Sequence, residues 1–238
     1  MRMKIVLYIS LGINLILILL IGYKLYLKYY QRPEQQKQIP SGQAPIQYSE
    51  NRVEYLKNLP CDSGSIIFTG NSFIQNFELA ELFQNLKVKN RGIAADFTVG
   101  VLNRIGPDLA CHPSKIFIET GINDLLFDAE PELVINYYKE ILKKIKSESP
   151  AIKIYILCVF PTGVLSCFDK QPLIQKIQFL NSSLKSLCAL EGITFVDTYQ
   201  QFEHNGVLKP EFDCGDGLHL NARGYLLWRD LLRKYVDE

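Results

Sequence analysis

Hydrophobic and polar positions alternate in two rhythms from about residue 61 to the carboxyl end of the chain. Short runs rich in Val, Ile and Phe predict strands, and longer stretches with apolar residues every three or four positions predict helices. The predicted strands are Ser65–Thr69, Lys87–Asn90, Lys115–Thr120, Lys153–Phe160 and Thr194–Asp197. The predicted helices are Phe73–Leu86, Val99–Ala110, Glu132–Ser147, Leu173–Leu190 and Ala222–Val236. This alternation predicts an α/β fold, a three-layer α/β/α sandwich around five parallel strands.

The amino-terminal part has a different pattern, because the 19 residues from Ile5 to Tyr23 carry no charge. As a helix this run is ~28 Å long, close to the hydrocarbon thickness of a bilayer. It predicts one transmembrane helix within a membrane anchor at residues 1–30. A cleaved signal peptide is the alternative, but its apolar core is shorter and ends at a small-x-small cleavage site, whereas Lys24 follows here.

Residues 31–49 are rich in Gln, Pro and Ser and poor in large apolar side chains. This composition is typical of a solvated linker. Residues 50–238 then form one α/β domain, because a chain of 238 residues is too short for two typical domains with connections.

The formal net charge of +1 is the sum of a basic amino-terminal part and an acidic remainder. Residues 1–40 hold six basic residues and one acidic residue, whereas the rest of the chain holds 20 basic and 24 acidic residues. The near-neutral total excludes a polybasic protein that binds nucleic acid. Basic residues flank the apolar run on both sides, so the positive-inside rule assigns it no orientation.

All six cysteines lie in the predicted domain, and no two are within four positions of each other. They are Cys61, Cys111, Cys158, Cys167, Cys188 and Cys214. This spacing lacks the close pairs of a typical zinc site, so the sequence predicts no metal. One cysteine in a strand run, Cys158, and one on an apolar helix face, Cys188, predict buried free thiols. Because the number of cysteines is even, they could also form disulfides, and the sequence does not decide between paired and free thiols.

Polar residues gather just after the predicted strands, where open parallel sheets bind their ligands. The first three strands are followed by Gly-Asn-Ser at 70–72, Asn-Arg-Gly-Ile at 90–93 and Gly-Ile-Asn-Asp at 121–124. Asp-Gly-Leu-His at 216–219 precedes the last predicted helix. Each block alone has a structural explanation, as a helix cap or a turn. Their joint occurrence in this order favours a catalytic site.

The residue types in these blocks suit nucleophilic catalysis. The hydroxyl of Ser72 is a weak nucleophile and needs a neighbouring base, for which His219 is the candidate. Asp216 lies three residues before His219 and can hold one imidazole nitrogen while the other faces Ser72 Oγ. The Gly-x-Ser-x-Gly elbow of α/β-hydrolases is absent, because residues 70–74 read Gly-Asn-Ser-Phe-Ile.

In this order the four blocks resemble those of the SGNH, or GDSL, serine hydrolases, and the resemblance extends from about Ser65 to Tyr235. It implies a flavodoxin-like sandwich and a Ser72–His219–Asp216 triad that needs no metal or organic cofactor. It also implies an oxyanion hole made by the backbone N–H groups of Ser72 and Gly92 and the side-chain amide of Asn123. The first block departs from the usual Gly-Asp-Ser, because residue 71 is asparagine.

The Asn-Arg-Gly-Ile and Asp-Gly-Leu-His-Leu-Asn forms resemble one branch of this family, the catalytic subunits of platelet-activating-factor acetylhydrolase and sugar acetylesterases. The resemblance implies a serine esterase that removes a short acyl group, foremost acetyl, from an alcohol such as a carbohydrate hydroxyl. A lysophospholipase or thioesterase and an O-acyltransferase are alternatives on the same fold. A carbohydrate-binding protein without activity is a fourth, which the complete triad disfavours.

Location and partners follow from the same resemblance. Anchored esterases of this type commonly act outside the cytoplasm, which implies a single-pass protein with an extracytoplasmic domain, periplasmic or at the cell surface. The expected partners are a small acyl ester, a glycan that carries it and the membrane around residues 1–30, with no nucleic acid. Four apolar residues beside the catalytic blocks are expected to pack in the core rather than line a pocket: Phe73, Ile74, Phe97 and Phe127.

Overall fold

The computed structural model describes residues 46–163 and 170–238 of the chain. The predicted anchor at residues 1–30 lies outside these ranges, as does most of the predicted linker. Within the described ranges, none of the helices combines the length and the apolar character that a membrane span requires. The first described helix, α2 (Ile46–Lys57), begins within the predicted linker and buries Leu56 against the domain.

The five predicted strands are confirmed, each within a few residues of its expected bounds. They are β1 (Ile66–Gly70), β2 (Val88–Gly92), β3 (Lys115–Glu119), β4 (Lys153–Leu157) and β5 (Thr194–Val196). All neighbouring pairs are parallel and the spatial order is β2-β1-β3-β4-β5. The order reverses between β1 and β3, so the carboxyl ends of these two strands form the switch point at which α/β sheets bind ligands.

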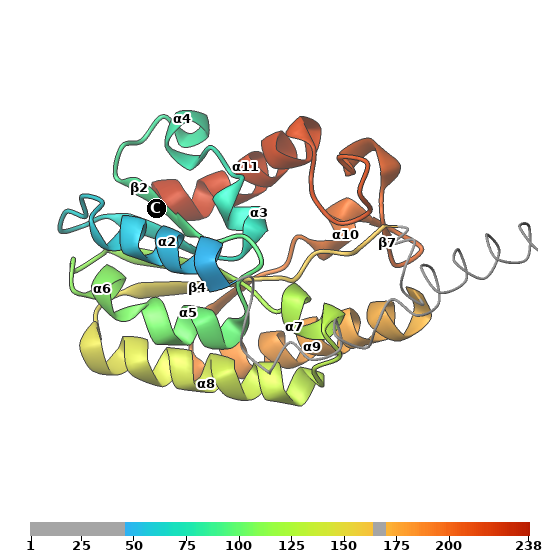
Figure 1. Cartoon of the computed structure of the whole chain (residues 1–238), viewed down its shortest axis with the longest axis horizontal. Helices are drawn as coiled ribbons and strands as arrows, with labels where there is room; N and C mark the ends of the chain where they lie inside the picture. Colours follow the sequence, from blue (N-terminus) through green and yellow to red (C-terminus); the bar gives the residue numbers. More distant parts are fainter. Residues whose placement is uncertain (1–45, 164–169) are drawn as a thin grey trace, which may run out of the picture. The chain divides into compact units, whose positions relative to one another are not determined.

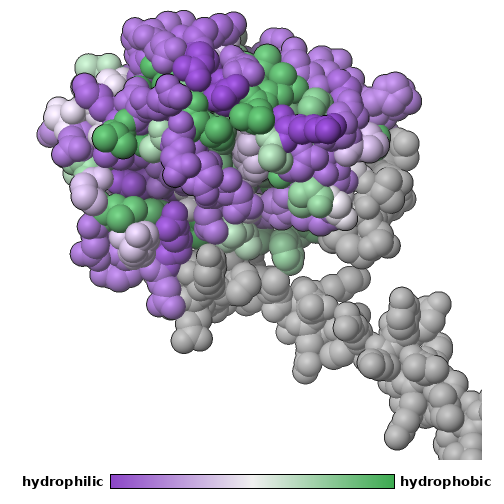
Figure 2. Space-filling view, turned by 90° about the horizontal axis from the view of Figure 1, so that it is seen from above, coloured by the Kyte–Doolittle hydropathy of each residue, from purple (hydrophilic) through white to green (hydrophobic). Residues whose placement is uncertain are grey.

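Helices cover both faces of the sheet and complete the predicted three layers. One face carries α5 (Thr98–Arg104), α8 (Pro131–Glu148) and α9 (Lys170–Glu191), and the other carries α4 (Leu79–Phe83) and α11 (Ala222–Asp237) (Figure 1). Figure 2 shows the domain from the side of α4 and α11 as a mostly polar surface with a smaller apolar patch. The apolar side of α11 is turned inward, since Trp228 and Leu232 are fully buried.

Two of the five predicted helices are each divided into two short ones. The stretch predicted over Phe73–Leu86 forms α3 (Ser72–Gln75) and α4, and the stretch predicted over Val99–Ala110 forms α5 and α6 (Gly106–Leu109). The second division coincides with Pro107, which lacks the N–H of a continuous helix and suits a first turn.

Shorter elements connect these layers at the carboxyl ends of the strands. They are α7 (Ile122–Leu126), α10 (Tyr199–Phe202), the hairpin of β6 (Glu203–His204) and β7 (Val207–Leu208), and a 3-10 turn at Pro210–Phe212.

The core on the α11 side is built from stacked aromatic rings. Phe68, Phe117 and Tyr155 occupy matching positions of β1, β3 and β4, and their rings stack with centroids 4.3 Å and 4.4 Å apart. Trp228 stacks on Phe77 at 4.9 Å, as expected for a residue on the apolar side of the last helix. This rigid layer supports the strand ends that carry the polar blocks.

The described cysteines divide into one disulfide and three free thiols. Cys61 and Cys111 form the disulfide, which joins the chain before β1 to the turn after α6 with a Cα–Cα distance of 5.6 Å. The predicted buried free thiols at Cys158 and Cys188 are confirmed, and Cys214 is free and exposed.

Candidate active site

Ser72 stands where β1 turns sharply into α3. Gly70 has a φ of +152°, and a Cβ there would collide with the carbonyl oxygen of Glu119 on the neighbouring strand, so only glycine fits this turn. Asn71 caps the helix by accepting a hydrogen bond from Phe73 N at 2.8 Å. Ser72 is therefore the first residue of α3, at the carboxyl end of the sheet.

The three residues predicted as a triad form one hydrogen-bonded row. The distance from Ser72 Oγ to His219 Nε2 is 2.8 Å, and the distance from His219 Nδ1 to Asp216 Oδ2 is 2.6 Å. The other carboxylate oxygen, Asp216 Oδ1, accepts the backbone N–H groups of Leu218 and His219, both at 2.8 Å. A proton on Nδ1 leaves Nε2 free to accept the hydroxyl proton of Ser72.

The electrostatics of this row favour an ionised carboxylate. Partial burial opposes ionisation of Asp216, but the hydrogen bonds from the His219 ring and from the backbone of His219 and Leu218 hold its pKa well below the usual range. The carboxylate therefore keeps the imidazole proton on Nδ1 and can stabilise a positive charge on the ring.

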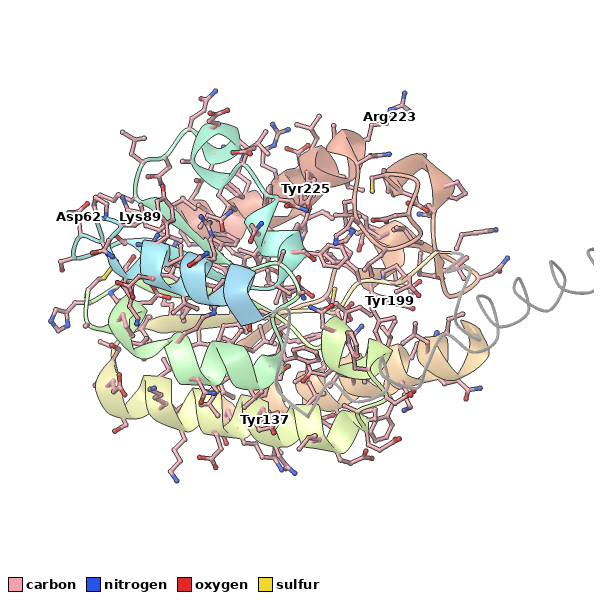
Figure 3. The ribbon with its side chains drawn as sticks, viewed as in Figure 1. Asp62, Lys89, Tyr137, Tyr199, Arg223 and Tyr225 are labelled. Carbon is pink, nitrogen blue, oxygen red and sulfur yellow. A yellow bond between two sulfur atoms is a disulfide. The ribbon has the colours of Figure 1, made fainter. Side chains whose placement is uncertain are left out.

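The histidine also packs against the turn that carries Ser72. The ring of Phe73 lies 5.7 Å from the His219 ring, centroid to centroid. Tyr225, labelled in Figure 3, donates from its hydroxyl to the Phe73 carbonyl at 3.1 Å and so ties α11 to α3. The hydroxyl on α3 is thus held near the base, because α11, which begins three residues after His219, is bonded to α3.

The structure corrects the role predicted for Gly92. Its backbone N–H, expected to face the substrate, donates to Asn90 Oδ1 at 2.9 Å. A Cβ at this position would collide with Gln75 N, so the glycine is needed for the close packing of α3 on β2. The side chain of Asn90 also donates to the carbonyls of Ile74 and Phe77, at 2.6 Å and 3.0 Å. The Asn-Arg-Gly block at the end of β2 therefore packs against α3 and holds it in place.

Ala95 is a residue that sequence reasoning missed. It has a φ of +59° in the turn closed by the bond from Asp96 N to Ile93 O at 3.1 Å. Among the described residues, Ala95 is the one position from 93 to 98 whose backbone N–H has no hydrogen-bond partner. A left-handed conformation is uncommon for alanine, so this turn is strained, and strain of this kind gathers at functional sites.

Asn123 holds the turn of Ala95 in place. It lies near the start of α7 and donates from Nδ2 to the backbone oxygen of Asp96 at 2.8 Å. The amide has a second N–H, which this bond leaves available. The next residue, Asp124, accepts from the backbone and the hydroxyl of Thr98 at 3.0 Å and 2.9 Å. Burial raises the pKa of Asp124 to about 6, although these bonds from Thr98 oppose the rise.

Arg104 joins the strand ends around the site, and no sequence motif points to it. Its guanidinium donates to the carbonyls of Gly70 and Arg91 at 2.9 Å and 2.8 Å and pairs with Asp96 Oδ2 at 2.7 Å. Both partners of the ion pair are largely buried, which limits solvent screening. Arg104 thereby fixes the turn that contains Ala95 relative to the end of β1.

A comparison with models of protein families identifies the family. Residues 70–227 match the GDSL-like Lipase/Acylhydrolase family. The chain belongs to this family. It is therefore a hydrolase that acts on ester bonds, and its α/β fold with a five-stranded parallel sheet is that of the SGNH hydrolases. A search of curated proteins finds no match to the chain.

Several solved structures share the fold of this hydrolase. A protein from Streptococcus pneumonia, described as a platelet activating factor, has a TM-score of 0.72 and 26% identity over 80% of this chain and 94% of its own. A GDSL-like lipase from Bacteroides thetaiotaomicron has a TM-score of 0.68 and 21% identity, covering 80% and 96%. The lipase/acylhydrolase from Enterococcus faecalis has a TM-score of 0.61 and 21% identity, covering 72% and 95%.

Two aromatic residues of the GDSL-like domain lie on the segments bonded to Asn123: Phe127 N donates to Asn123 O at 3.0 Å, and Phe97 follows Asp96, whose backbone oxygen accepts from the Asn123 side chain. The rings of Phe97 and Phe127 are 5.4 Å apart, and Phe127 is 53% exposed. Phe97 directly precedes α5, and Phe127 directly follows α7. By contrast, Phe73 and Ile74 are fully buried, as expected for core residues. The expected core packing is therefore wrong for Phe127, whose ring is exposed, whereas Phe97 is partly buried.

Proposed function

We propose that this hydrolase is a serine esterase that removes short acyl groups, foremost acetyl, from a carbohydrate hydroxyl. The observation that carries the catalytic part is the continuous row from Ser72 Oγ through the His219 ring to Asp216, with distances of 2.8 Å and 2.6 Å. These separations allow direct proton transfer between the hydroxyl and the base.

In the proposed mechanism, Ser72 Oγ attacks the ester carbonyl while its proton moves to His219 Nε2. The Asp216 carboxylate stabilises the imidazolium that forms. The imidazolium then gives its proton to the oxygen of the leaving alcohol, and the acyl group stays on Ser72. Water, activated by the same imidazole, attacks this acyl-enzyme and releases the carboxylic acid.

The negative charge on the carbonyl oxygen needs hydrogen-bond donors that are already in place. We assign this role to the backbone N–H groups of Ser72 and Ala95 and to the second N–H of the Asn123 amide. Ala95 replaces Gly92 in this assignment, because the Gly92 N–H is bound to Asn90. Removal of one such donor typically raises the barrier by about 3–4 kcal/mol.

The substrate class rests on similarity. The chain shares 26% identity with the protein from Streptococcus pneumonia described as a platelet activating factor. Its Asn-Arg-Gly-Ile and Asp-Gly-Leu-His-Leu-Asn blocks resemble those of acetylhydrolases and sugar acetylesterases. The resemblance of these blocks supports a short acyl group, and we assign the Phe97–Phe127 pair as the apolar surface that a small acyl or alcohol group would contact.

A panel of acyl chain lengths tests this proposal. The full chain should hydrolyse p-nitrophenyl acetate faster than the octanoate and palmitate esters, and it should release acetate from acetylated sugars. Ser72→Ala should lower the rate by about four to six orders of magnitude. Ser186→Ala, an exposed serine on α9, is the matched control and should keep the full rate.

The same panel separates the alternatives. A preference for palmitate esters or lysophospholipids would replace the acetylesterase with a lipase-type function, and a preference for thioesters would indicate a thioesterase. Acyl transfer to added sugar in excess of hydrolysis would indicate an O-acyltransferase. Binding of a glycan without turnover of any ester would favour a carbohydrate-binding protein.

We also infer that residues 1–30 anchor the enzyme in a membrane with the catalytic domain on the extracytoplasmic side. The uncharged run from Ile5 to Tyr23 supports the anchor. The Cys61–Cys111 disulfide supports an extracytoplasmic location of the domain, because disulfides persist mainly in oxidising compartments. In a Cys167→Ala background, a thiol reagent that does not cross membranes should label the exposed Cys214 on intact cells, and a further Cys214→Ala substitution should remove this label. Labelling only after lysis would contradict the orientation.

A further inference from the structure

A thiol, a carboxylate and an imidazole come together beside the proposed nucleophile. Ligand atoms of Cys214, Asp216 and His219 all lie within 4.8 Å of one another. No other group of three such ligands is found in the described ranges. Sulfur, nitrogen and carboxylate oxygen are the ligands that Zn²⁺ takes in proteins, at bond lengths of about 2.0–2.3 Å. A tetrahedral ion therefore fits among these atoms after small side-chain movements.

The backbone presets this grouping. Cys214 N donates to His219 O at 3.0 Å, so the two residues face each other across the loop. Asp213 Oδ1 accepts the N–H groups of Gly215 and Gly217 at 2.7 Å and 3.1 Å, which closes the intervening turn. Cys214 is exposed, so an ion from solvent can reach the thiol without opening the fold.

We propose that Cys214, Asp216 and His219 bind one Zn²⁺ ion and that this ion switches the esterase off. The inhibitory part rests on the proposed function, whereas the binding part depends only on the three ligands. Cys214 has no role in the proposed ester hydrolysis, so it serves here as the residue that turns the base and its carboxylate into a metal site.

Inhibition follows from the single proton of a neutral imidazole. In the active arrangement this proton is on Nδ1, bonded to Asp216, and the lone pair of Nε2 faces Ser72. An ion bound to His219 Nδ1 takes the lone pair there, and the ring proton moves to Nε2. Nε2 then cannot accept the proton of Ser72. The Cys214 thiol releases its proton to solvent on binding, and no oxidation state changes.

Co²⁺ tests the binding part without any substrate. Added to the full chain, it should give the near-ultraviolet charge-transfer band of a cobalt–thiolate bond, and Zn²⁺ should remove that band by displacement. Cys214→Ala should lack the band, whereas the control Cys188→Ala, a buried thiol, should keep it. A wild-type protein without the band, or a Cys214→Ala protein with it, would overturn the proposal.

Ester hydrolysis tests the inhibitory part. Zn²⁺ should inhibit p-nitrophenyl acetate hydrolysis, EDTA should restore it, and Mg²⁺, which prefers oxygen ligands, should have no effect. Cys214→Ala should keep the metal-free rate and need at least about tenfold more Zn²⁺ for half inhibition. Equal inhibition of both proteins would overturn this part. If the wild type hydrolyses no ester, the proposed function fails, while the cobalt band still decides the metal site.

Discussion

The side chain of Asn71 lies between the backbone amide of Phe73 and the carboxyl group of Glu119. Asn71 Oδ1 accepts from Phe73 N at 2.8 Å, and Asn71 N donates to the Glu119 carbonyl at 3.3 Å. Asn71 Nδ2 and both Glu119 carboxyl oxygens are buried without a hydrogen bond of standard geometry to any described residue. Burial raises the pKa of Glu119 to about 8, and the Asn71 amide opposes this rise. A neutral residue at position 71 therefore avoids two buried carboxyl groups side by side.

Asn71→Asp should destabilise the fold more than it impairs catalysis. The new carboxyl group would stand next to Glu119, and one of the two must take up a proton or lose its favourable contacts. We expect the free energy of unfolding to fall by about 1–3 kcal/mol at neutral pH, measured by urea denaturation. The esterase rate per folded molecule should largely remain, because Asn71 touches no reacting atom in the proposed mechanism.

Glu119→Gln provides the second arm of a double-mutant cycle. In this background Asn71→Asp has no neighbouring carboxyl group, so its cost should shrink and the coupling free energy should reach at least about 1 kcal/mol. Additive effects of the two substitutions would show that the Asn71–Glu119 contact has no energetic weight.

Glu119 should also make the fold less stable at higher pH. Its folded-state pKa of about 8 lies above the ordinary value of 4.5, so between these values the folded state holds the extra proton. The stability that this group contributes is fully present below about pH 4.5 and is lost as the pH rises through about 8. In this window the free energy of unfolding falls by up to about 1.4 kcal/mol per pH unit. The surrounding Tyr138, Tyr225 and Cys158 stay neutral in this window, because burial raises the pKa of each.

Urea denaturation at several pH values measures this slope. Burial raises the pKa of Asp124 to about 6, so Asp124 also lowers stability as the pH rises. This contribution to the slope is the same in the wild type and in Glu119→Gln. The difference between the two proteins therefore isolates Glu119. Identical slopes would mean that Glu119 does not take up a proton on folding.

Replacing single backbone N–H groups by ester oxygens should distinguish Ala95 from Gly92. Lactic acid in place of Ala95 removes the free N–H and keeps the methyl group, so kcat should fall by about 10²–10³-fold with little change in KM. Glycolic acid in place of Gly92 removes a donor that is bonded to Asn90, so it should lower stability and leave kcat of the folded enzyme nearly unchanged. The reverse result would restore Gly92 as the donor.

Ala95→Gly complements that experiment. Glycine adopts the φ of +59° without strain but gains freedom in the unfolded chain, so stability should change by less than about 1 kcal/mol. The esterase rate should stay near that of the wild type, because the N–H is kept. Ala95→Val, which is β-branched and strained at this φ, should lower both quantities.

The Cys61–Cys111 disulfide should contribute measurably to stability. It closes a loop with a sequence separation of 50, for which chain entropy predicts a stabilisation of about 4 kcal/mol. Cys61→Ser with Cys111→Ser should lower the free energy of unfolding by an amount of this order, as should reduction with dithiothreitol. The control Cys214→Ala removes an exposed thiol and should have little effect. Equal stability with and without reductant would contradict this expectation.

Much of the fold could be predicted from the sequence, because the strands and helices follow from local patterns of apolar and polar residues. Four of the five strands are short apolar runs, and α8, α9 and α11 repeat apolar residues at helical spacing, so their existence and order follow from periodicity. The positions of Ser72 and His219 at one end of the sheet follow from the same order, because the carboxyl ends of parallel strands meet there. The division of α3 from α4 could not be predicted from periodicity. Side-chain hydrogen bonds from Asn90, a residue of β2, to the carbonyls of Ile74 and Phe77 end α3.

The sequence by itself determined the α/β class, the family blocks and the candidate hydroxyl, base and carboxylate, because these depend on residue type and local spacing. Only the tertiary structure decided that the Gly92 N–H is occupied and the Ala95 N–H is free, that Glu119 lies against Asn71, and that Cys61 pairs with Cys111. Each of these facts is a distance between atoms of different elements. Periodicity records which face of an element is buried, but not which atoms meet across the core.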